Sequence, residues 1–596
     1  MRIKPKYIWF LAFTAVFAVL ASIVFWGTWA LDVVPIMPDC PTSFSIDYSG
    51  DFCRNWLLNG KFVPGDIIAF IGDPYFWVEL KYVLALFFAA FALSYFLIGR
   101  GLSRFAAYSA GLFLAFCGYW CTLFSAGHLG WFQWMTYGVF AFGLIDRMLE
   151  KGKIRHSVML GAVVAWGSFY QADLWLIFTF FTSIYFVFRS IMVRPGWKAW
   201  ALRSIVAFAV FVGIGLPSFR SALYSDLAGR DKQIEEGQTL TEDSLSPKEK
   251  RWRFVTNWSM PPEDTVEFIR AGVHGDTSCP MTLAIGNARG ADVKPYEGRL
   301  GRPLMPDGNE APAGNYRQHS LYVGWVTCLF ALLGIASLFF KGEDEGKRLL
   351  ERRSTVVFFL VAGLLFWVLS MGRYVEGAYR CVFALPFGDY LRAPVKWHHL
   401  TEFCIVVLAA YGLHFVWKFF PVSHYDICAR TFFILVALFG AFDLALEAQK
   451  FCAPHSADTI VGQFPQPAPP DREQLENMYN AVAGRKPTNH EIRESSKRRD
   501  SYFESLKSAG LTIVGTVKNK CLVAPGVEMD FDFPVVEQKV PRPGLVRREH
   551  DKELGGFAFA AAATSLTLTV LTLLYLSLSL FVKRFDRIKI LKGKQI

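Results

Sequence analysis

Charged residues are scarce in this chain of 596 residues, and so are the spacings that mark many soluble enzymes. Asp, Glu, Lys and Arg make up 19% of the sequence, whereas soluble globular proteins average about 25%. The 11 cysteines include no CxxC pair, which excludes a zinc ribbon or a thioredoxin-like site. No Walker loop, dinucleotide glycine fingerprint, GxSxG elbow or HExxH helix occurs, so ATP-driven transport and metalloprotease chemistry have no support.

Apolar residues are abundant instead. They form 53% of the chain, 16% of it is aromatic, and the mean hydropathy is +0.29. A membrane span needs about 20 mostly apolar helical residues. Segments of that kind predict an all-α polytopic membrane protein with about twelve spans, at 7–30, 77–98, 105–124, 130–146, 157–172, 174–192, 204–217, 320–340, 355–371, 402–418, 431–447 and 556–582.

Basic residues between these spans predict the orientation, because Lys and Arg collect in short cytoplasmic loops. With the N-terminus inside, the inner segments hold Arg100, Arg104, Arg147, Arg189, Arg203, Arg348, Arg352 and the tail KRFDRIKILKGK. The short outer turns near Gly127 and Ala172 have neither Lys nor Arg. We therefore expect a multi-pass protein of the inner (plasma) membrane with both termini in the cytoplasm. Most of the +11 net charge is then a topology signal, and a nucleic acid partner is not expected.

The spans and loops predict a division into membrane modules and small extracytoplasmic α+β lobes. The predicted parts are a membrane module at 1–217 with its outer loop 31–76, a lobe at 218–319, a second module at 320–448 with its outer loop 372–400, a second lobe at 449–555, and a last span with a basic tail at 556–596. In the second lobe, Asp471–Val482 is predicted to be a helix. The stretch TIVGTVKNKCLVAPGVEMDFDF alternates as two strands joined by a turn do.

Two pairs of cysteines share predicted outer segments, Cys40 with Cys53 and Cys452 with Cys521. An oxidising outer compartment permits disulfides there, and spacing alone does not decide between disulfides and free thiols. Cysteines in or beside spans are expected to pack as small apolar side chains.

The first outer loop is rich in aspartate, and Asp47 and Asp51 are its main candidates for chemistry. The segment FCRNWLLNGK after them is amphipathic, so a helix lying at the interface would hold both carboxylates at the membrane surface. Such a carboxylate suits a general base that deprotonates an acceptor hydroxyl, or a metal ligand. Aspartate is also common in turns, and that ordinary role stays open.

The next two outer turns contribute further polar candidates. His128 lies in SAGHLGWFQW between glycines that permit close backbone approach. It suits a hydrogen bond to a phosphate or a sugar hydroxyl, and equally a helix cap beside an interfacial tryptophan belt. The turn GSFYQADLW offers Gln171 and Asp173, both of them weaker candidates.

The outer loop 372–400 is basic where the positive-inside rule disfavours Lys and Arg. Its segment RAPVKWHH contains Arg392, Lys396 and His398. Clustered basic groups suit a phosphate or diphosphate, which arginine binds in a bidentate manner. Pairing with the Asp-rich first loop is the alternative. Both interpretations place Asp47 near Arg392.

The order of these motifs resembles the GT-C superfamily of integral-membrane glycosyltransferases, and within it the YfhO-like bacterial membrane proteins. The resemblance rests on Asp47 followed by NGKFVPGD, on AGHLGWFQW, on FYQADLW, on NWSMPPEDTVEFI ahead of LYVGWVTCLFALLG, and on LPFGDYLRAPVKW leading to AAYGL. Together these motifs cover most of residues 1–415. Many members of the superfamily have an adjacent acidic pair, whereas Asp47 and Asp51 are four residues apart.

This resemblance implies a GT-C-like fold and an inverting transfer of a sugar from a polyprenyl-phosphate donor to an extracytoplasmic acceptor, which is a cell-envelope glycan, lipid or protein. Asp47 would be the catalytic base, with Asp51 as its substitute, and His128, Gln171, Arg392, Lys396 and His398 would bind the donor. No cofactor is required, although a divalent metal is compatible with the site. Membrane lipids are expected partners, and the lobes suit a protein partner.

Two alternative functions stay open at this point. One is a transporter of lipid or polysaccharide. Transporters usually place ionisable residues near the middle of the bilayer, and most predicted span interiors here have none. The other is a non-catalytic scaffold of an envelope-assembly complex that binds its partners through the outer lobes.

Overall fold

A computed structural model describes most of the helices and part of the outer segments. The described residues are 5–25, 74–120, 129–169, 172–221, 245–275, 298–302, 304, 309–310, 320–340, 346–385, 388–419, 424–451, 459–463, 468–483, 485–508, 511–524, 527–539 and 564–575 without 566, 570 and 574.

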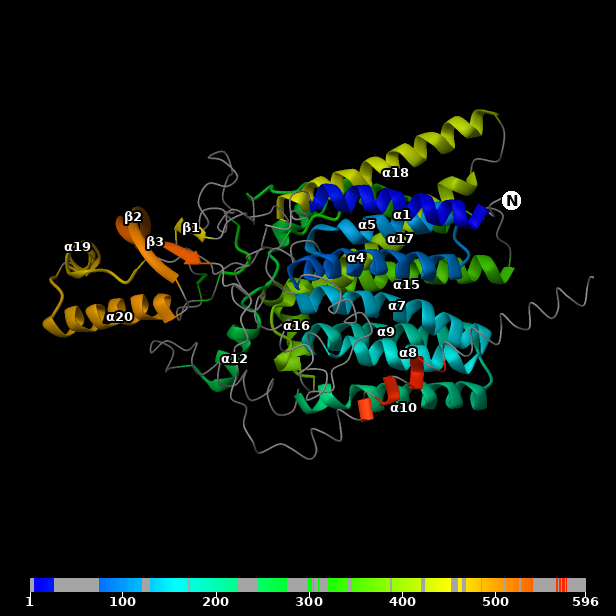
Figure 1. The fold of residues 1–596 in the computed structure, drawn as a ribbon, viewed down its shortest axis with the longest axis horizontal. Helices are drawn as coiled ribbons and strands as arrows, with labels where there is room; N and C mark the ends of the chain where they lie inside the picture. Colours follow the sequence, from blue (N-terminus) through cyan, green and yellow to red (C-terminus); the bar gives the residue numbers. More distant parts are fainter. Residues whose placement is uncertain are drawn as a thin grey trace, which may run out of the picture.

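The described part is mainly a bundle of apolar helices. The long ones are α1 (Pro5–Val24), α4 (Pro74–Gly99), α7 (Leu129–Lys151), α9 (Ala172–Val193), α10 (Trp197–Ser221), α15 (Gly346–Ser370), α17 (His398–Phe419) and α18 (His424–Phe451). The shorter ones are α5 (Arg104–Phe116), α8 (Ile154–Gly167) and α14 (Trp325–Ala336), which the 3₁₀ turn η4 (Ser337–Phe339) extends. These helices run side by side along one axis (Figure 1).

Seven helices in the described part are long and apolar enough to cross a bilayer, and they identify the chain as a membrane protein. They lie within α1, α4, α9, α10, α15, α17 and α18. Large apolar side chains such as Ile191, Ile205 and Phe208 are exposed on these helices, as expected where lipid replaces water. The predicted total of twelve spans is not shown. Most of the last predicted span, 556–582, lies outside the described residues.

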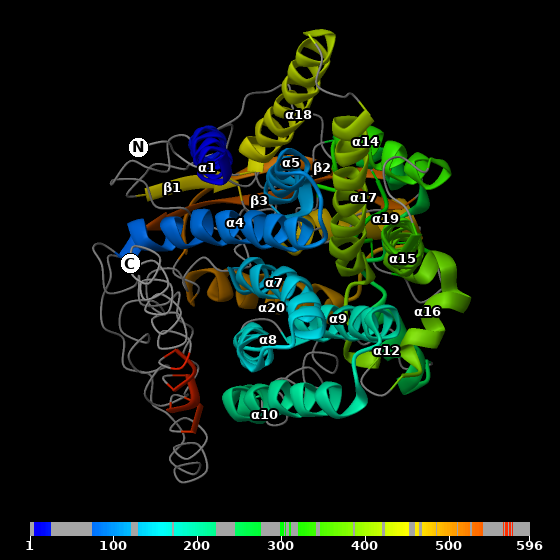
Figure 2. The same cartoon turned by 90° about the vertical axis from the view of Figure 1, so that its right-hand side faces the viewer.

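Helix α17 is the most buried of the seven candidate spans in the described part. It packs against α14, α15 and α5, and Figure 2 views the bundle along its axis with α17 between these helices. Glycine permits the closest of these contacts. A Cβ on Gly412 would lie 1.9 Å from the carbonyl oxygen of Phe330, and a Cβ on Gly334 would lie 2.1 Å from that of Leu408. Small residues of this kind let two membrane helices bring their backbones together.

Shorter elements cover one end of the bundle. They are α12 (Pro247–Val255), η3 (Pro262–Phe268), η5 (Gly372–Val375), α16 (Glu376–Phe383), η6 (Gly388–Tyr390) and η7 (Pro394–Trp397). Figure 1 shows α12 and α16 at the end opposite the start of α1. Under the predicted orientation this is the outer end of the bundle, and the opposite end is the inner end.

A small sheet with two helices lies beyond the outer end (Figure 1). Strands β1 (Thr459–Gln463), β2 (Leu511–Ala524) and β3 (Val527–Lys539) form an antiparallel sheet in the order β1-β3-β2. The register pairs Thr459 with Lys539 and Leu511 with Gln538. Strands β2 and β3 occupy the stretch predicted to be two strands.

The two helices of this region are α19 (Arg472–Ala483) and α20 (Asn489–Ser508). Asp471 and Gln474 start α19 with reciprocal bonds: the Gln474 amide donates to the Asp471 carboxylate at 2.8 Å, and the Asp471 amide donates to the Gln474 side chain at 3.0 Å. This capping box explains why the helix begins where the sequence predicts. Helix α20 was not predicted, since no element is expected from the sequence between Val482 and the two strands.

One basic residue is placed differently from the prediction. Arg189, predicted to lie in an inner loop, is fully buried in α9 and forms an ion pair with Asp146 at 2.6 Å. Arginine can occupy a buried position only when nearby carboxylates compensate its charge, and these carboxylates come from α7 and α15. The positive-inside rule counts basic residues and cannot detect such pairing.

Candidate functional site

The segment RAPVKWHH crosses the outer end and leads from η6 through η7 into α17. Its Ala393 has a left-handed backbone with φ of 63°, which costs a non-glycine residue roughly 1 kcal/mol or more. Two backbone hydrogen bonds hold this conformation, from the Ala393 amide to the Val255 carbonyl and from the Val395 amide to the Trp258 carbonyl, both at 2.9 Å. A strained residue held from both sides is typical of a functional segment.

A third segment joins this pair at Gly372. Gly372 has φ of 48°, and a Cβ there would lie 2.2 Å from the Ser259 hydroxyl oxygen and 2.5 Å from the Pro394 ring. The Arg373 amide donates to the Ser259 hydroxyl at 3.0 Å, and the Met260 amide donates to the Ser370 carbonyl at 2.9 Å. Residues 255–260, 370–373 and 392–395 therefore form one junction, called the outer junction below.

Arg392 is oriented by two aromatic rings of α12 and the turn after it. Its guanidinium carbon lies 4.7 Å from the ring centres of both Phe254 and Trp258. Such cation–π contacts contribute about 0.5–2 kcal/mol each. Stacking uses the face of the guanidinium, whereas phosphates and carboxylates bind at its N–H edge. The arrangement thus fixes a half-buried arginine at the outer end in an orientation that suits an anion.

Lys396 lies deeper and is paired. Its ammonium group contacts the carboxylate of Asp173 in the first turn of α9, and both side chains are buried. The other carboxylate oxygen of Asp173 accepts the Leu174 amide at 2.9 Å. The pair connects the FYQADLW motif to RAPVKW across the bundle. Lys396 was predicted to contact a phosphate, and the structure gives its charge a partner within the protein.

His398 and His399 begin α17 next to a carboxylate that was not predicted. Nε2 of His398 lies 3.6 Å from Oε1 of Glu402, and Nδ1 of His399 lies 3.9 Å from Oε2. All three side chains are fully buried. The His398 ring packs on Phe268 with ring centres 4.6 Å apart, and the His399 ring stacks on Tyr119 at 4.0 Å.

The remaining arginines of the loop 372–400 have carboxylate partners as well. Arg373 forms an ion pair with Glu310 at 3.0 Å, and Arg380 with Glu376 at 2.6 Å. Tyr374 donates to Glu310 at 2.7 Å, and burial raises the pKa of Tyr374 to about 12. The sequence offered pairing with the first outer loop as an alternative to phosphate binding. Arg373 and Arg380 pair instead with Glu310 and Glu376, neither of which belongs to that first loop.

A second ion pair, between Arg299 and Glu263, lies beside the pair of Arg373 and Glu310. Arg299 donates to both oxygens of Glu263, at 2.6 and 2.8 Å. The bidentate Arg299 guanidinium lowers the pKa of the Glu263 carboxyl. The Arg299 guanidinium also lies 4.7 Å from the centre of the Tyr374 ring. These contacts connect residues near 299 and 263 to η5.

The predicted site residues divide into two sets. Arg392, Lys396 and His398 lie within one segment at the outer end. Asp47, Asp51, His128 and Gln171 lie outside the described residues, and the predicted approach of Asp47 to Arg392 falls there too. Of the two cysteine pairs, Cys40, Cys53 and Cys452 also lie outside them, whereas Cys521 lies in β2. Within the described residues, no group of three or more His, Cys, Asp and Glu side chains is arranged to hold a metal ion.

Sequence reasoning missed Glu402, Trp258 and Phe254, and it left Asp173 out of the expected donor-binding residues. Glu402 did carry a signal, because it is an acidic residue inside an apolar run and lies four residues after His398, and an ionisable residue within a span is a functional candidate by default. The two aromatic residues carried none, since any Trp or Phe at the membrane surface fits an interfacial belt.

Comparisons with known proteins give little further assignment. No protein-family model matches the chain, and no curated protein sequence matches it. Among solved structures, the arabinofuranosyltransferase AftD from mycobacteria is similar with a TM-score of 0.40 and 12% identity, over 91% of this chain and 40% of that one. The chain thus spans about two fifths of the length of that structure. Similarity at this level assigns neither the fold nor an activity.

Proposed function

We propose that the chain is a GT-C type glycosyltransferase that moves a sugar from a polyprenyl-phosphate donor to an acceptor on the outer side of the membrane. The observation that carries the proposal is the convergence of four motifs at one end of the bundle. Asp173 of FYQADLW pairs with Lys396 of RAPVKW. NWSMPPEDTVEFI bonds to RAPV through its backbone, and its Phe268 carbonyl accepts the amides of Val323 and Gly324 in LYVGW at 3.1 Å.

The donor's charge gives Arg392 its proposed role. Polyprenyl phosphate is an anionic membrane lipid whose phosphate is esterified to the polyprenol. The phosphate therefore lies at the membrane surface, at the depth of the helix ends. Arg392 stacks its face on two protein rings, those of Phe254 and Trp258, and we propose that its N–H edge binds the phosphate. Lys396 and His398 lie behind it and support this segment, while His128 and Gln171 are proposed to contact the sugar.

The proposed reaction needs a base and an anion site. Asp47, with Asp51 as its substitute, takes the proton from an acceptor hydroxyl. The acceptor oxygen then forms a bond to the sugar C1, and the bond from C1 to the phosphate oxygen breaks with inversion. The electron pair leaves with polyprenyl phosphate, whose negative charge Arg392 stabilises. The sugar–phosphate bond is already activated, so orientation and electrostatic stabilisation supply the remaining rate enhancement.

The first test measures binding, because the sugar and the acceptor are not identified. The protein is reconstituted in nanodiscs, and retention of undecaprenyl phosphate is compared with that of undecaprenol by native mass spectrometry. Arg392→Gln is expected to weaken binding of the phosphate about tenfold or more, since a charge-assisted hydrogen bond contributes about 1.5–3 kcal/mol. Arg270→Gln, at an exposed arginine of the same outer end, is the matched control and should bind as the wild type does.

A second test addresses catalysis with a panel of polyprenyl-phosphate sugars. Asp47→Asn is expected to abolish transfer while folding and donor binding persist. Equal retention of the phosphate and the alcohol would contradict the proposal. Movement of the lipid-linked sugar across proteoliposomes without a transfer product would favour a transporter instead. Full function of the Asp47 and Arg392 variants with a stoichiometric protein partner would favour a scaffold.

A further inference from the structure

Glu402 is a buried carboxylate whose surroundings do not include a permanent cation. It lies four residues after His398, the first residue of α17, which is the most buried of the candidate spans in the described part. In the part of the chain that the structure describes, its ion-pair contacts are limited to the two neighbouring histidines, and its Oε2 atom has no hydrogen-bond partner. Burying a carboxylate costs several kcal/mol unless hydrogen bonds compensate it. If this side chain only filled space between helices, leucine would give a more stable protein than glutamate.

The hydrogen bond that Glu402 does make leads to a different part of the chain. Its Oε1 atom accepts the backbone amide of Tyr119 at 3.2 Å. Tyr119 belongs to residues 117–120, which follow the end of α5 and precede the segment SAGHLGWF with His128. The bond therefore connects residues 117–120, which precede the His128 segment, to the beginning of α17, which contains the last residues of RAPVKWHH.

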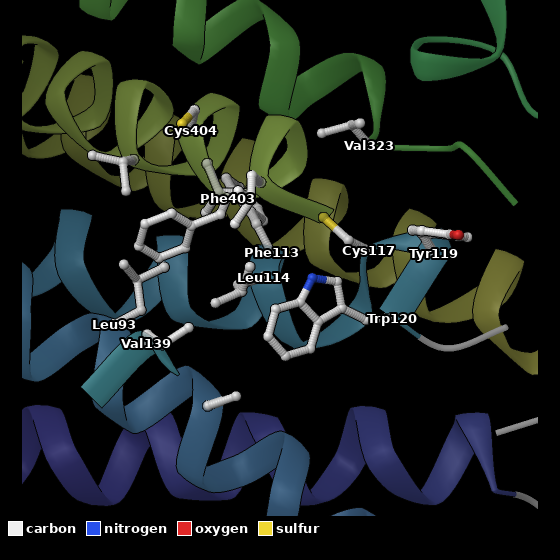
Figure 3. Packing of buried hydrophobic residues seen from close by; sticks show 14 of the residues in the cluster. Leu93, Phe113, Leu114, Cys117, Tyr119, Trp120, Val139, Val323, Phe403 and Cys404 are labelled. Carbon is white, nitrogen blue, oxygen red and sulfur yellow. The ribbon is translucent and has the colours of Figure 1, made fainter. Parts of the chain in front are cut away.

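Residues 117–120 are held on their other side as well. The Gly118 amide donates to the Tyr322 carbonyl at 2.8 Å, and a Cβ on Gly118 would lie 2.3 Å from the Ser320 hydroxyl oxygen. Trp120 is buried in the apolar cluster of the bundle. Figure 3 shows its ring near Leu114, with Tyr119 leaving the backbone in another direction. The amides of residues 117, 118 and 120 bond to backbone carbonyls, and the amide of Tyr119 bonds to Glu402 of α17.

We propose that Glu402 is a positioning residue, which holds residues 117–120 against the RAPVKWHH segment through its hydrogen bond to the Tyr119 amide. It thereby fixes residues 117–120, from which the chain continues toward His128, relative to the segment that contains Arg392. This inference rests on the proposed function for the meaning of the two segments. The tie between residues 117–120 and α17 is independent of it.

The experiment compares Glu402→Gln with Glu402→Leu by hydrogen exchange on the full protein in nanodiscs. Glutamine keeps the acceptor oxygen, so exchange in peptides covering 117–131 should stay within about twofold of the wild type. Leucine has a similar size without an acceptor, and exchange there should rise at least tenfold, which corresponds to the loss of about 1.4 kcal/mol. Thr401→Val, a buried polar-to-apolar change in the same turn of α17, is the control and should leave these peptides unchanged.

Undecaprenyl phosphate binding supplies the readout that a purely structural role would not move. Glu402→Leu should weaken it about tenfold at unchanged global stability after correction for any unfolded fraction, and Glu402→Gln should restore it. If Glu402→Leu fails to fold, Glu402→Met, which also lacks an acceptor, replaces it with the same expected rise in exchange and loss of binding. Unchanged exchange in Glu402→Leu, or equal damage from Gln and Leu, overturns the proposal. Absence of binding by the wild type would instead overturn the proposed function and leave the exchange result interpretable.

Discussion

The two ends of the helix bundle both contain buried charges, and they use them differently. At the inner end, Arg189 is bonded to Asp146 at 2.6 Å, to Glu150 at 2.5 Å and to Glu351 at 2.9 Å. Arg100 shares Glu351 at 2.9 Å. These five residues come from α7, α9, α15 and the end of α4, and each charge has a partner of opposite sign.

The outer end has a pair and several polar groups that the described residues leave unsatisfied. Lys396 and Asp173 form the pair. Both ring nitrogens of His398, one oxygen of Glu402 and two nitrogens of Arg373 have no hydrogen-bond partner among the described residues. Within the inner network, Asp146 and Arg100 each leave one such atom, and the neighbouring Arg147, His156 and Arg353 leave one each as well among the described residues. Buried polar groups are normally satisfied, and exceptions concentrate at functional sites.

The difference assigns separate tasks to the two ends. The inner network joins the first membrane module to the second, because Glu351 of α15 binds arginines of α4 and α9. An aromatic layer borders it, in which Phe358 stacks on Phe188 with ring centres 4.5 Å apart. Opening this end would expose these rings at about 1.5–3 kcal/mol each. The inner end therefore connects the helices on its two sides, while the ligand site that we propose lies at the outer end.

The largest effect is expected from breaking the inner connection. Arg189→Met leaves Asp146 buried without its closest cation, which should destabilise the protein by about 3–5 kcal/mol. Thermal unfolding in detergent measures the loss, and donor binding by the folded fraction should be unchanged. Arg348→Gln, at an exposed residue near the start of α15, is the control with an expected effect within about 0.5 kcal/mol. A mild effect of Arg189→Met would mean that the inner end opens readily to water.

A change at the outer junction should affect both stability and binding. Gly372→Ala places a methyl group against the Ser259 hydroxyl and the rigid Pro394 ring at a positive φ, so a loss of about 1–3 kcal/mol is expected. Because Pro394 follows the strained Ala393, the displaced segment should also bind undecaprenyl phosphate less tightly. Gly377→Ala in α16 meets no atom within 4 Å and should be neutral or slightly stabilising. Loss of stability with unchanged binding would separate the junction from the proposed site.

More of the outer end than of the inner end could be predicted from the sequence, for physical reasons. Apolar runs report burial in lipid or protein, so the positions of most helices and of the β2–β3 pair followed from the pattern. Side-chain pairing depends on which helices become neighbours, which one sequence does not contain. Arg189 therefore counted as a loop residue, and Glu402 and the aromatic contacts of Arg392 were not seen. RAPVKWHH was recognised because basic residues outside the membrane break a rule that the rest of the chain follows.

The smallest effect concerns the exposed edge of the outer end, where Glu263 and Arg299 form a bidentate pair with both side chains about two-fifths exposed. The pair lowers the pKa of Glu263 when the protein is folded, whereas an unfolded glutamate titrates near pH 4.3. The folded state then binds fewer protons, so this contribution is present above about pH 4.3 and is lost as the pH falls through the lower folded pKa. Solvent screening keeps it small.

Glu263→Gln should therefore make stability between about pH 3 and pH 5 less dependent on pH, with little change at pH 7. Chemical unfolding across this range measures the slope, and Arg299→Gln should flatten it in the same way because it removes the cause of the shift. An unchanged slope in both variants would show that the pair does not form in solution. A loss of stability at pH 7 comparable to that of Arg189→Met would show instead that this exposed edge is as strongly coupled to the fold as the inner network, and the contrast between the two ends would fail.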